Sequence, residues 1–321
     1  MSSFKLAIPR ESDGYKPLED IIQSVERICQ YYLSEENPSV KDSDGISRRL
    51  KRAVTRQSLN DFVNTLDDFN KSVEQSSESN AISTNMKSLH HVPLPLIERI
   101  LSQIYARTVS PRVESLRKYE NGTDNVYGEL LPRFASQIFK DAKLTSDQVF
   151  VDLGSGVGNV VLQAALEIGC QSWGCEIMPN PCDLAKLQAD EFRARCRLWG
   201  ILPGQVHLIQ GNFLTDEEVA KVLTRADVIL VNNQAFTPAL NDDLVLKFLD
   251  LKEGARLISL KSFVPSGFRM QARNAHDPRN LLSVTRKEYG SCCVSWTDSG
   301  GEYFVAVKDS KKLDDFQKSL R

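Results

Sequence analysis

The segment from Val149 to Asn159 constrains the fold of this chain more than any other. Its first half, Val-Phe-Val-Asp-Leu, has the pattern of a buried strand, and its second half carries three glycines at alternate positions, Gly154, Gly156 and Gly158. Glycine at such a strand-to-helix turn lets the backbone approach a nucleotide-like ligand closely. The pattern therefore favours a ligand-binding turn in an α/β sheet, and a glycine-rich turn without a ligand is the alternative.

Spacing and charge narrow the class of ligand. Dinucleotide-binding turns read Gly-x-Gly-x-x-Gly and hold a pyrophosphate at the helix N-terminus. Here the spacing is Gly-x-Gly-x-Gly, and Asp152 stands two residues before the first glycine. A carboxylate repels a pyrophosphate but attracts an ammonium group. The turn, which we extend to Asn159, resembles the cofactor loop of methyltransferases that use S-adenosylmethionine, whose amino-acid end is zwitterionic.

Strand and helix patterns alternate after residue 121. Apolar runs predict strands at 149–153, 172–176, 206–210, 228–231 and 256–260, separated by helices at about 159–168, 181–199, 216–224 and 240–250. This alternation predicts a doubly wound, mostly parallel sheet with its ligand at the carboxyl ends of the strands. Two later β-rich runs, 282–289 and 292–296 continuing to 303–307, predict an antiparallel edge.

The first third of the chain has helical patterns instead. Apolar residues at helical spacing predict helices over 17–33, 47–75 and about 95–109, with a loop at 34–45 and a mobile Ser- and Asn-rich segment at 76–88. We therefore divide the chain into a helical N-terminal region (1–120), a sheet domain (121–310) and a C-terminal tail (311–321).

Composition argues against several classes of protein. The formal net charge is -2, which provides no global attraction to nucleic acid. We expect no membrane span, because no run of about 18 apolar residues occurs. The first residues lack the apolar core of a secretory signal. Seven cysteines and four histidines show no zinc-site spacing, so we expect a reducing compartment and no metal.

Three further residues fit a nucleoside ligand at the sheet edge. Glu176 ends the second predicted strand about twenty residues after the glycines, where a carboxylate accepts ribose hydroxyls. Asn212 and Phe213 follow the third strand, as an amide that accepts from the adenine amine and a ring that stacks on adenine. A surface acid, a loop asparagine and a core phenylalanine are the structural alternatives.

The fourth strand ends in polar and aromatic residues that suit an amine acceptor. Asn232 and Phe236 follow it, and we expect the amide to orient an amine and the ring to line its approach. An Asn-Asn turn is the alternative. Tyr127, Gly128 and Glu129 precede the sheet and are interpreted either as a lid over the cofactor or as an acidic helix start.

Taken together, these residues resemble the disruptor-of-telomeric-silencing histone-lysine methyltransferases, which lack the SET fold. The resemblance covers about residues 121–308 and rests on six motifs, Val126–Glu129, Val151–Gly158, Gly174–Glu176, Val231–Phe236, Ser259–Phe263 and Val294–Thr297. It implies a class I methyltransferase fold, a seven-stranded Rossmann-like sheet, here with an N-terminal α-helical region.

The resemblance also implies an activity. Members transfer methyl groups from S-adenosylmethionine to a lysine on the globular core of histone H3, position seventy-nine, in the nucleosome, with roles in chromatin silencing and the DNA damage response. Asn232 then matches the asparagine beside the transferred methyl, and Tyr303 and Trp296 match walls of the lysine channel. Arg273 matches an arginine that some members place on the acidic patch, and nuclear location and contact with ubiquitinated H2B are implied in the same way.

The chain departs from the family in three places. Asn212 replaces an acid at the adenine, Glu120–Thr123 lacks an aromatic, and no long lysine-rich arm for nucleosomal DNA is evident. The only dense basic run contains Arg48, Arg49, Lys51 and Arg52, which is either a phosphate-binding stripe or a solvated helix face. Two rival functions stay open, a class I methyltransferase acting on another amine and an inactive chromatin-binding module.

Overall fold

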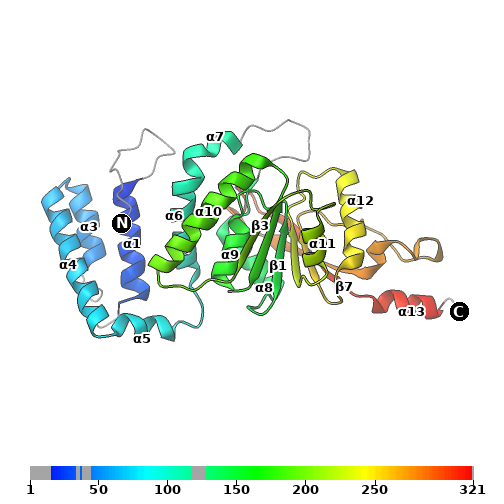
Figure 1. Ribbon diagram of the computed structural model, residues 1–321, viewed down its shortest axis with the longest axis horizontal. Coiled ribbons are helices and arrows are strands. Elements are labelled where there is room, and N and C mark those ends of the chain that lie inside the picture. Colours follow the sequence, from blue (N-terminus) through cyan, green and yellow to red (C-terminus); the bar gives the residue numbers. More distant parts are fainter. Residues whose placement is uncertain (1–15, 34–36, 38–44, 117–127, 320–321) are drawn as a thin grey trace. The chain divides into compact units, whose positions relative to one another are not determined.

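The computed structural model describes residues 16–33, 37, 45–116 and 128–319 (Figure 1). The chain forms two compact units, and the boundary between them along the sequence falls between Pro111 and Arg112. Within the described ranges, no helix is both long enough and apolar enough to cross a membrane.

The described part of the first unit is helical. Its helices are α1 (Pro17–Tyr31), α3 (Ile46–Thr55), α4 (Leu59–Glu78), α5 (Ala81–Ser88) and α6 (Leu94–Thr108). Buried apolar residues of α1, α3 and α4, such as Val25, Leu50 and Phe62, pack into one cluster. The helical character predicted for this part of the chain is therefore confirmed.

Two details of the N-terminal helices differ from the sequence prediction. The single helix expected over 47–75 is broken between Thr55 and Leu59, where Gln57 adopts a left-handed φ of 53°. Ser58 then caps α4, since its Oγ accepts the Asp61 N–H at 3.3 Å. The prediction of a mobile segment at 76–88 was wrong, because α4 continues to Glu78 and α5 occupies residues 81–88.

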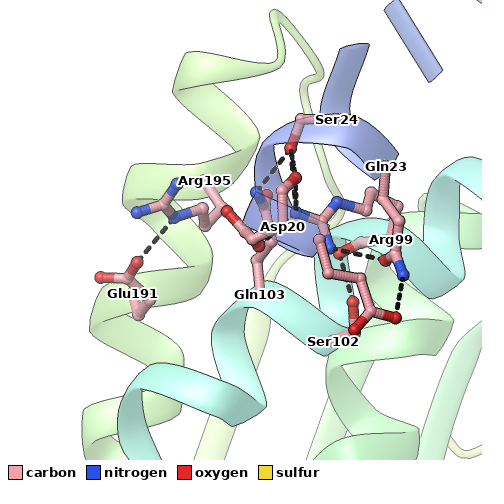
Figure 2. Close-up of polar contacts among 9 residues, drawn as sticks. Asp20, Gln23, Ser24, Arg99, Ser102, Gln103, Glu191 and Arg195 are labelled. Carbon is pink, nitrogen blue, oxygen red and sulfur yellow. Dashed lines mark hydrogen bonds and ion pairs between the residues drawn. The ribbon is translucent and has the colours of Figure 1, made fainter. Parts of the chain in front are cut away.

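A buried arginine joins α6 to α1 (Figure 2). Arg99 is 6% exposed, and its guanidinium donates to the Asp20 carboxylate, to Gln23 Oε1 at 3.1 Å and to Ser24 Oγ at 2.9 Å. Gln103 also donates to Ser24 Oγ, at 3.2 Å. A buried charge is tolerated only when it is paired and hydrogen-bonded, so this cluster fixes α1 on α6.

The second unit is built on a seven-stranded sheet with the strand order β3-β2-β1-β4-β5-β7-β6. The strands are β1 (Val149–Leu153), β2 (Gln171–Glu176), β3 (Val206–Gln210), β4 (Val228–Val231), β5 (Arg256–Ser259), β6 (Leu282–Tyr289) and β7 (Gly301–Lys308). The first five are parallel, and β7 runs antiparallel to both β5 and β6. The predicted doubly wound sheet with an antiparallel edge is confirmed, and its order reverses between β1 and β4, where ligands of such sheets bind.

Helices cover both faces of this sheet (Figure 1). On one face lie α8 (Pro132–Asp141), α9 (Asn159–Glu167) and α10 (Pro179–Leu198), and on the other lie α11 (Glu217–Leu223) and α12 (Pro238–Lys247). Alternate strand residues serve the two faces, so Phe150 packs with α8 and α9 whereas Val151 packs with α11 and α12. The remaining short elements are η1 (Ser110–Arg112), α7 (Val113–Leu116), η2 (Phe248–Asp250), η3 (Ala272–Asn274), η4 (Pro278–Leu281) and α13 (Lys311–Ser319).

The last hairpin of the sheet differs from the prediction between its two strands. Residues 292–296 were expected to be β-rich, but they form turns, with Cys292 at a left-handed φ of 55° and Val294 in isolated bridges to Leu130 and Thr297. At the end of β7, the Lys308 ammonium is buried and donates to the carbonyls of Leu249 and Leu251. Burial lowers the pKa of Lys308.

Candidate active site

The glycine turn after β1 folds as a tight elbow. Gly154, Gly156 and Gly158 all adopt left-handed φ angles, of 84°, 54° and 85°. The N–H groups of Gly154 and Ser155 both donate to the carbonyl of Cys175 at the end of β2, at 2.8 and 3.0 Å. Other residue types would be strained at these φ angles, so glycine allows the elbow to adopt this backbone conformation.

Gly174 in the neighbouring strand makes room for the elbow. A Cβ atom at this position would lie 2.7 Å from Ser155 Oγ and 2.8 Å from Val161 Cγ2 of α9. Both distances are shorter than van der Waals contact, so the elbow and α9 can approach β2 only because residue 174 is glycine.

A cavity of about 330 Å³ opens at the carboxyl ends of the parallel strands in the second unit. The elbow, the ends of β2, β3 and β4, and the segment before α8 all contribute to its wall. It is lined by most of the predicted site residues, namely Gly128, Glu129, Asp152, Gly154, Gly156, Asn159, Glu176, Asn212, Phe213, Asn232 and Phe236. Gly158, Trp296 and Tyr303 do not line it, and Tyr127 lies outside the described residues.

Two acids form the polar end of the cavity. Asp152 is 4% exposed, and burial together with the nearby Glu176 raises its pKa to about 8. Glu176 accepts the Gly156 N–H at Oε2 (2.9 Å) and the Met178 N–H at Oε1 (2.8 Å). Each oxygen of Glu176 keeps a lone pair, so this carboxylate can receive two hydroxyls from a ligand.

Asn212 and Phe213 flank the cavity beyond β3. Asn212 is exposed, and its Oδ1 already accepts the Leu214 N–H at 2.9 Å, which the sequence pattern did not reveal. An amide oxygen has a second lone pair, so an adenine amine would share this oxygen with the backbone. The Phe213 and Phe236 rings are nearly parallel, at 25°, with centroids 6.2 Å apart, and they give this side of the cavity an apolar surface.

Asn232, directly after β4, is a further polar residue that lines the cavity. Its Nδ2 donates to the carbonyl of Gly128 at 3.2 Å, whereas its Oδ1 is buried and accepts no hydrogen bond from the described residues. A buried acceptor without a partner costs about 1–3 kcal/mol. Its presence on the wall of a cavity indicates a place for a donor from a bound molecule.

The adjacent Asn233 has a different task, which the sequence reasoning missed. It is fully buried, donates to Asn241 Oδ1 (2.9 Å) and to the Lys261 carbonyl (3.0 Å), and accepts the Lys261 N–H (2.8 Å). These bonds tie the end of β4 to the segment after β5 and to α12, and so hold Asn232 at the cavity. In the sequence, the two consecutive asparagines were the one feature that pointed to a role for Asn233.

The segment Gly128–Leu130, which we call the strap, is docked against the hairpin between β6 and β7. Glu129 exchanges two hydrogen bonds with Ser295, its N–H donating to Ser295 Oγ and its carbonyl accepting the Ser295 N–H, both at 2.9 Å. Trp296 is 40% exposed and lies on Gly128, where an added Cβ would be 2.8 Å from its Cε3 atom. Trp296 therefore packs against the strap and does not line the cavity. The contact of Ser295 with the strap was not predicted from the sequence.

Tyr303 is not brought to the cavity. It is fully buried on β7, its hydroxyl donates to the Asp141 carboxylate and accepts from Gln137 Nε2, and its ring packs edge-on against Phe134. Burial and the Asp141 carboxylate raise its pKa. Because its side chain faces α8, we leave Tyr303 out of the site.

None of the basic residues predicted to contact the nucleosome lines the cavity. Arg48, Arg49, Lys51 and Arg52 belong to α3 in the first unit, where Arg49 pairs with Asp68 and Lys51 pairs with Glu26, each at 2.6 Å. Arg273 lies in the exposed η3 turn of the second unit. Among the described residues, no group of three potential metal ligands occurs.

Known proteins similar to this chain carry related names. The chain is 56% identical over 319 residues to "Histone-lysine N-methyltransferase, H3 lysine-79 specific" of Emericella nidulans, and equally to the protein of that name from Aspergillus fumigatus. Each match covers 99% of this chain but only 64% of the relative. An O-methyltransferase of Bacillus cereus solved in complex with SAH aligns at a TM-score of 0.43 and 12% identity, over 65% of this chain and 90% of that one, which is too distant to support a conclusion.

A family model supplies the assignment. The model described as "Histone methylation protein DOT1" matches residues 105–308, which is more than half of the 321 residues and contains every strand of the sheet and the whole cavity wall. The chain therefore belongs to the histone methylation protein DOT1 family.

Proposed function

We propose that this chain transfers methyl groups from S-adenosylmethionine to the ε-amine of a lysine on the globular core of histone H3, lysine 79, in the nucleosome. The observation that carries the proposal is one cavity lined by the buried Asp152, by the neighbouring Glu176 and by Asn232, whose amide oxygen has no partner among the described residues. The relatives named as H3 lysine-79 specific methyltransferases support the choice of substrate.

The cavity wall fits the proposed cofactor in three respects. Asp152 suits the ammonium of the amino-acid end, Glu176 suits the ribose hydroxyls, and Phe213 suits the adenine face. Gly154 and Gly156, which line the cavity, place no side chain between the backbone and the ligand. Ligand pockets usually measure about 300–1,000 Å³, and this cavity lies at the small end of that range.

The bound cofactor supplies an electrophilic methyl group on a sulfonium centre. The chain must therefore help the lysine ammonium to lose a proton and position the neutral amine that results. A free lysine titrates near ~10.4, and desolvation in a cavity lined by Phe236 lowers that pKa. Asn232 Oδ1 then accepts a hydrogen bond from an N–H of the neutral amine and so orients its lone pair, while the released proton passes to water. Neither acid is assigned as a base, since both serve the cofactor.

The substrate class is tested by offering labelled cofactor to nucleosomes, free histones, RNA and DNA. We expect label on H3 in nucleosomes. Label on RNA or DNA instead would identify a methyltransferase for another amine, and nucleosome binding without any transfer would identify an inactive chromatin module. Label on free H3 but not on nucleosomes would also contradict the proposal.

The role of Asn232 is tested by Asn232→Ala. The variant should lose methyl transfer while binding S-adenosylhomocysteine as the wild type does, because the acids and the elbow are unchanged. Retained turnover on nucleosomes would refute the role. Asn241→Ala serves as the comparison, since Asn241 accepts a hydrogen bond from Asn233 rather than contacting Asn232, so its loss should affect stability first.

Docking on the nucleosome is proposed to use Arg273 for the acidic patch and the basic residues of α3 for DNA phosphates. A phosphate would replace surface ion pairs such as Arg49–Asp68, which are worth only about 0–1 kcal/mol. Nucleosome affinity should then fall with salt, with a log–log slope of about −0.9 for each phosphate contacted. Charge reversal on α3 should flatten that slope, whereas Arg273→Ala should lower affinity with the slope unchanged.

Two further elements of the proposal concern the cell. We propose that the protein acts in the nucleus, which imaging of a fluorescently tagged chain would test. We also propose that ubiquitinated H2B contributes to the docking surface. Nucleosomes with and without this modification, compared in the same transfer assay, would show whether the modification raises the rate.

A further inference from the structure

The two ends of the Asn232 amide have different surroundings, and this difference fixes its orientation. Nδ2 donates to the Gly128 carbonyl, whereas Oδ1 is buried without a hydrogen-bond partner among the described residues, in a side chain that lines the cavity. The reverse orientation would set two acceptors, Oδ1 and the Gly128 oxygen, against each other. The Gly128 carbonyl therefore decides that an acceptor, rather than a donor, is presented to a substrate amine.

The position of that carbonyl depends in turn on Ser295. The Gly128 carbonyl and the Glu129 N–H belong to one peptide unit, which is planar and trans, so they point in opposite directions. The carbonyl accepts from Asn232 at 3.2 Å, and the N–H donates to Ser295 Oγ at 2.9 Å. One rigid plane is thus hydrogen-bonded at both ends, and each bond polarises the other.

The strap has other attachments that do not involve the serine hydroxyl. The Ser295 N–H donates to the Glu129 carbonyl, and the Leu131 N–H donates to the Cys293 carbonyl, both at 2.9 Å. These backbone bonds hold the strap on the hairpin whatever side chain stands at position 295. The hydroxyl is therefore separable from general docking, because it acts on the one peptide that contacts Asn232.

We propose that Ser295 is a positioning residue for methyl transfer, which acts through the Gly128–Glu129 peptide to hold the Asn232 amide with Oδ1 toward the acceptor amine. This inference rests on the proposed function for its catalytic consequence but not for its structural one. Ser295 does not touch substrate or cofactor. It sets the direction of the group that does.

The kinetic test uses Ser295→Ala, Ser295→Thr and, as a matched control in the same hairpin, Ser299→Ala, whose exposed side chain lies outside the relay. Ser295→Ala should lower kcat on nucleosomes about tenfold, the effect of losing one hydrogen bond of about 1.4 kcal/mol, while cofactor affinity changes less than about threefold. Ser295→Thr keeps the hydroxyl and should recover most of kcat. An unchanged kcat in Ser295→Ala, a weaker cofactor affinity alone, or no recovery in Ser295→Thr would overturn the proposal.

A second measurement needs no substrate. In the wild-type chain with selectively ¹⁵N-labelled asparagine, the Asn232 side-chain amide should exchange with solvent slowly, and Ser295→Ala should accelerate that exchange about tenfold while Ser299→Ala leaves it unchanged. Equal exchange in all three proteins would refute the relay. If the wild type transfers no methyl to nucleosomes, the proposed function fails, and the exchange measurement still decides the relay.

Discussion

Asp152 should make cofactor binding depend steeply on pH. Its carboxyl is buried beside Glu176 and keeps its proton up to a pKa of about 8, but an ammonium ligand requires the carboxylate. Between pH 8 and pH 6 the ionised fraction of Asp152 in the free protein falls from about one half to about one hundredth, so the dissociation constant should rise about 50-fold. At pH 7 most binding events should release one proton.

Calorimetry with S-adenosylhomocysteine, in buffers of different ionisation enthalpy, measures both the affinity and the released proton. In Asp152→Asn the affinity should be lower throughout and its pH dependence between 6 and 8 should vanish. Binding that is independent of pH in the wild type, with no proton released, would refute the reasoning, because Asp152 would then be ionised before the ligand arrives.

The same carboxyl affects the stability of the ligand-free chain. The folded chain retains the Asp152 proton to about pH 8, whereas an aspartate in an unfolded chain loses it near ~3.9, so the unfolded state binds fewer protons between these values. The contribution of Asp152 to stability is therefore fully present below about pH 4 and is lost as the pH rises to about 8, by about 5 kcal/mol. Denaturant unfolding of Asp152→Asn should show a smaller loss over this range.

Three further substitutions test the packing described above. Gly174→Ala should destabilise the second unit by about 1–3 kcal/mol in urea unfolding, because its Cβ would meet the elbow and α9. Arg99→Leu should cost the first unit about 3 kcal/mol, since it leaves the partner carboxylate beside apolar surface, and an unchanged melting temperature would contradict the role of this cluster. Tyr303→Phe removes the hydrogen bond to Asp141, so it should reduce the free energy of unfolding by about 1 kcal/mol and leave kcat unchanged. A large loss of kcat would show that Tyr303 takes part in methyl transfer.

The parts of the structure that depend on local pattern could be predicted from the sequence. The bounds expected for β1, β3 and β4 agree with the structure to the residue. In β1 and β4, runs of mostly apolar residues between turn signals identify buried parallel strands. The cavity residues of the elbow and of Glu176 followed from spacing alone. Each lies at the end of a predicted strand, where the topology of such a sheet gathers side chains.

The parts that depend on contacts between distant segments could not be predicted in this way. Ser295 and Glu129 are 166 residues apart, and nothing in either local pattern indicates that they pair. Tyr303 alternates correctly along β7, but periodicity does not say which helix covers its face of the sheet, and α8 does. The break before α4 could have been predicted, since Ser58 stands three residues before Asp61, which is the spacing of a serine that caps a helix N-terminus. Apolar residues at helical spacing around the break concealed this pattern.

The position of β7 has a consequence for how the protein is made. Among the described strands, β6 pairs only with β7, and β7 is the one that joins β6 to β5, although it is synthesised last. When β6 has left the ribosome, it therefore has no partner strand through which to join the sheet until β7 follows. The glycine elbow and the acids can assemble from earlier segments, but the hairpin that holds the strap must wait for β7 to emerge. A nascent chain stalled before residue 301 should therefore contain every residue that lines the cavity, but its strap should not yet be held by the completed hairpin.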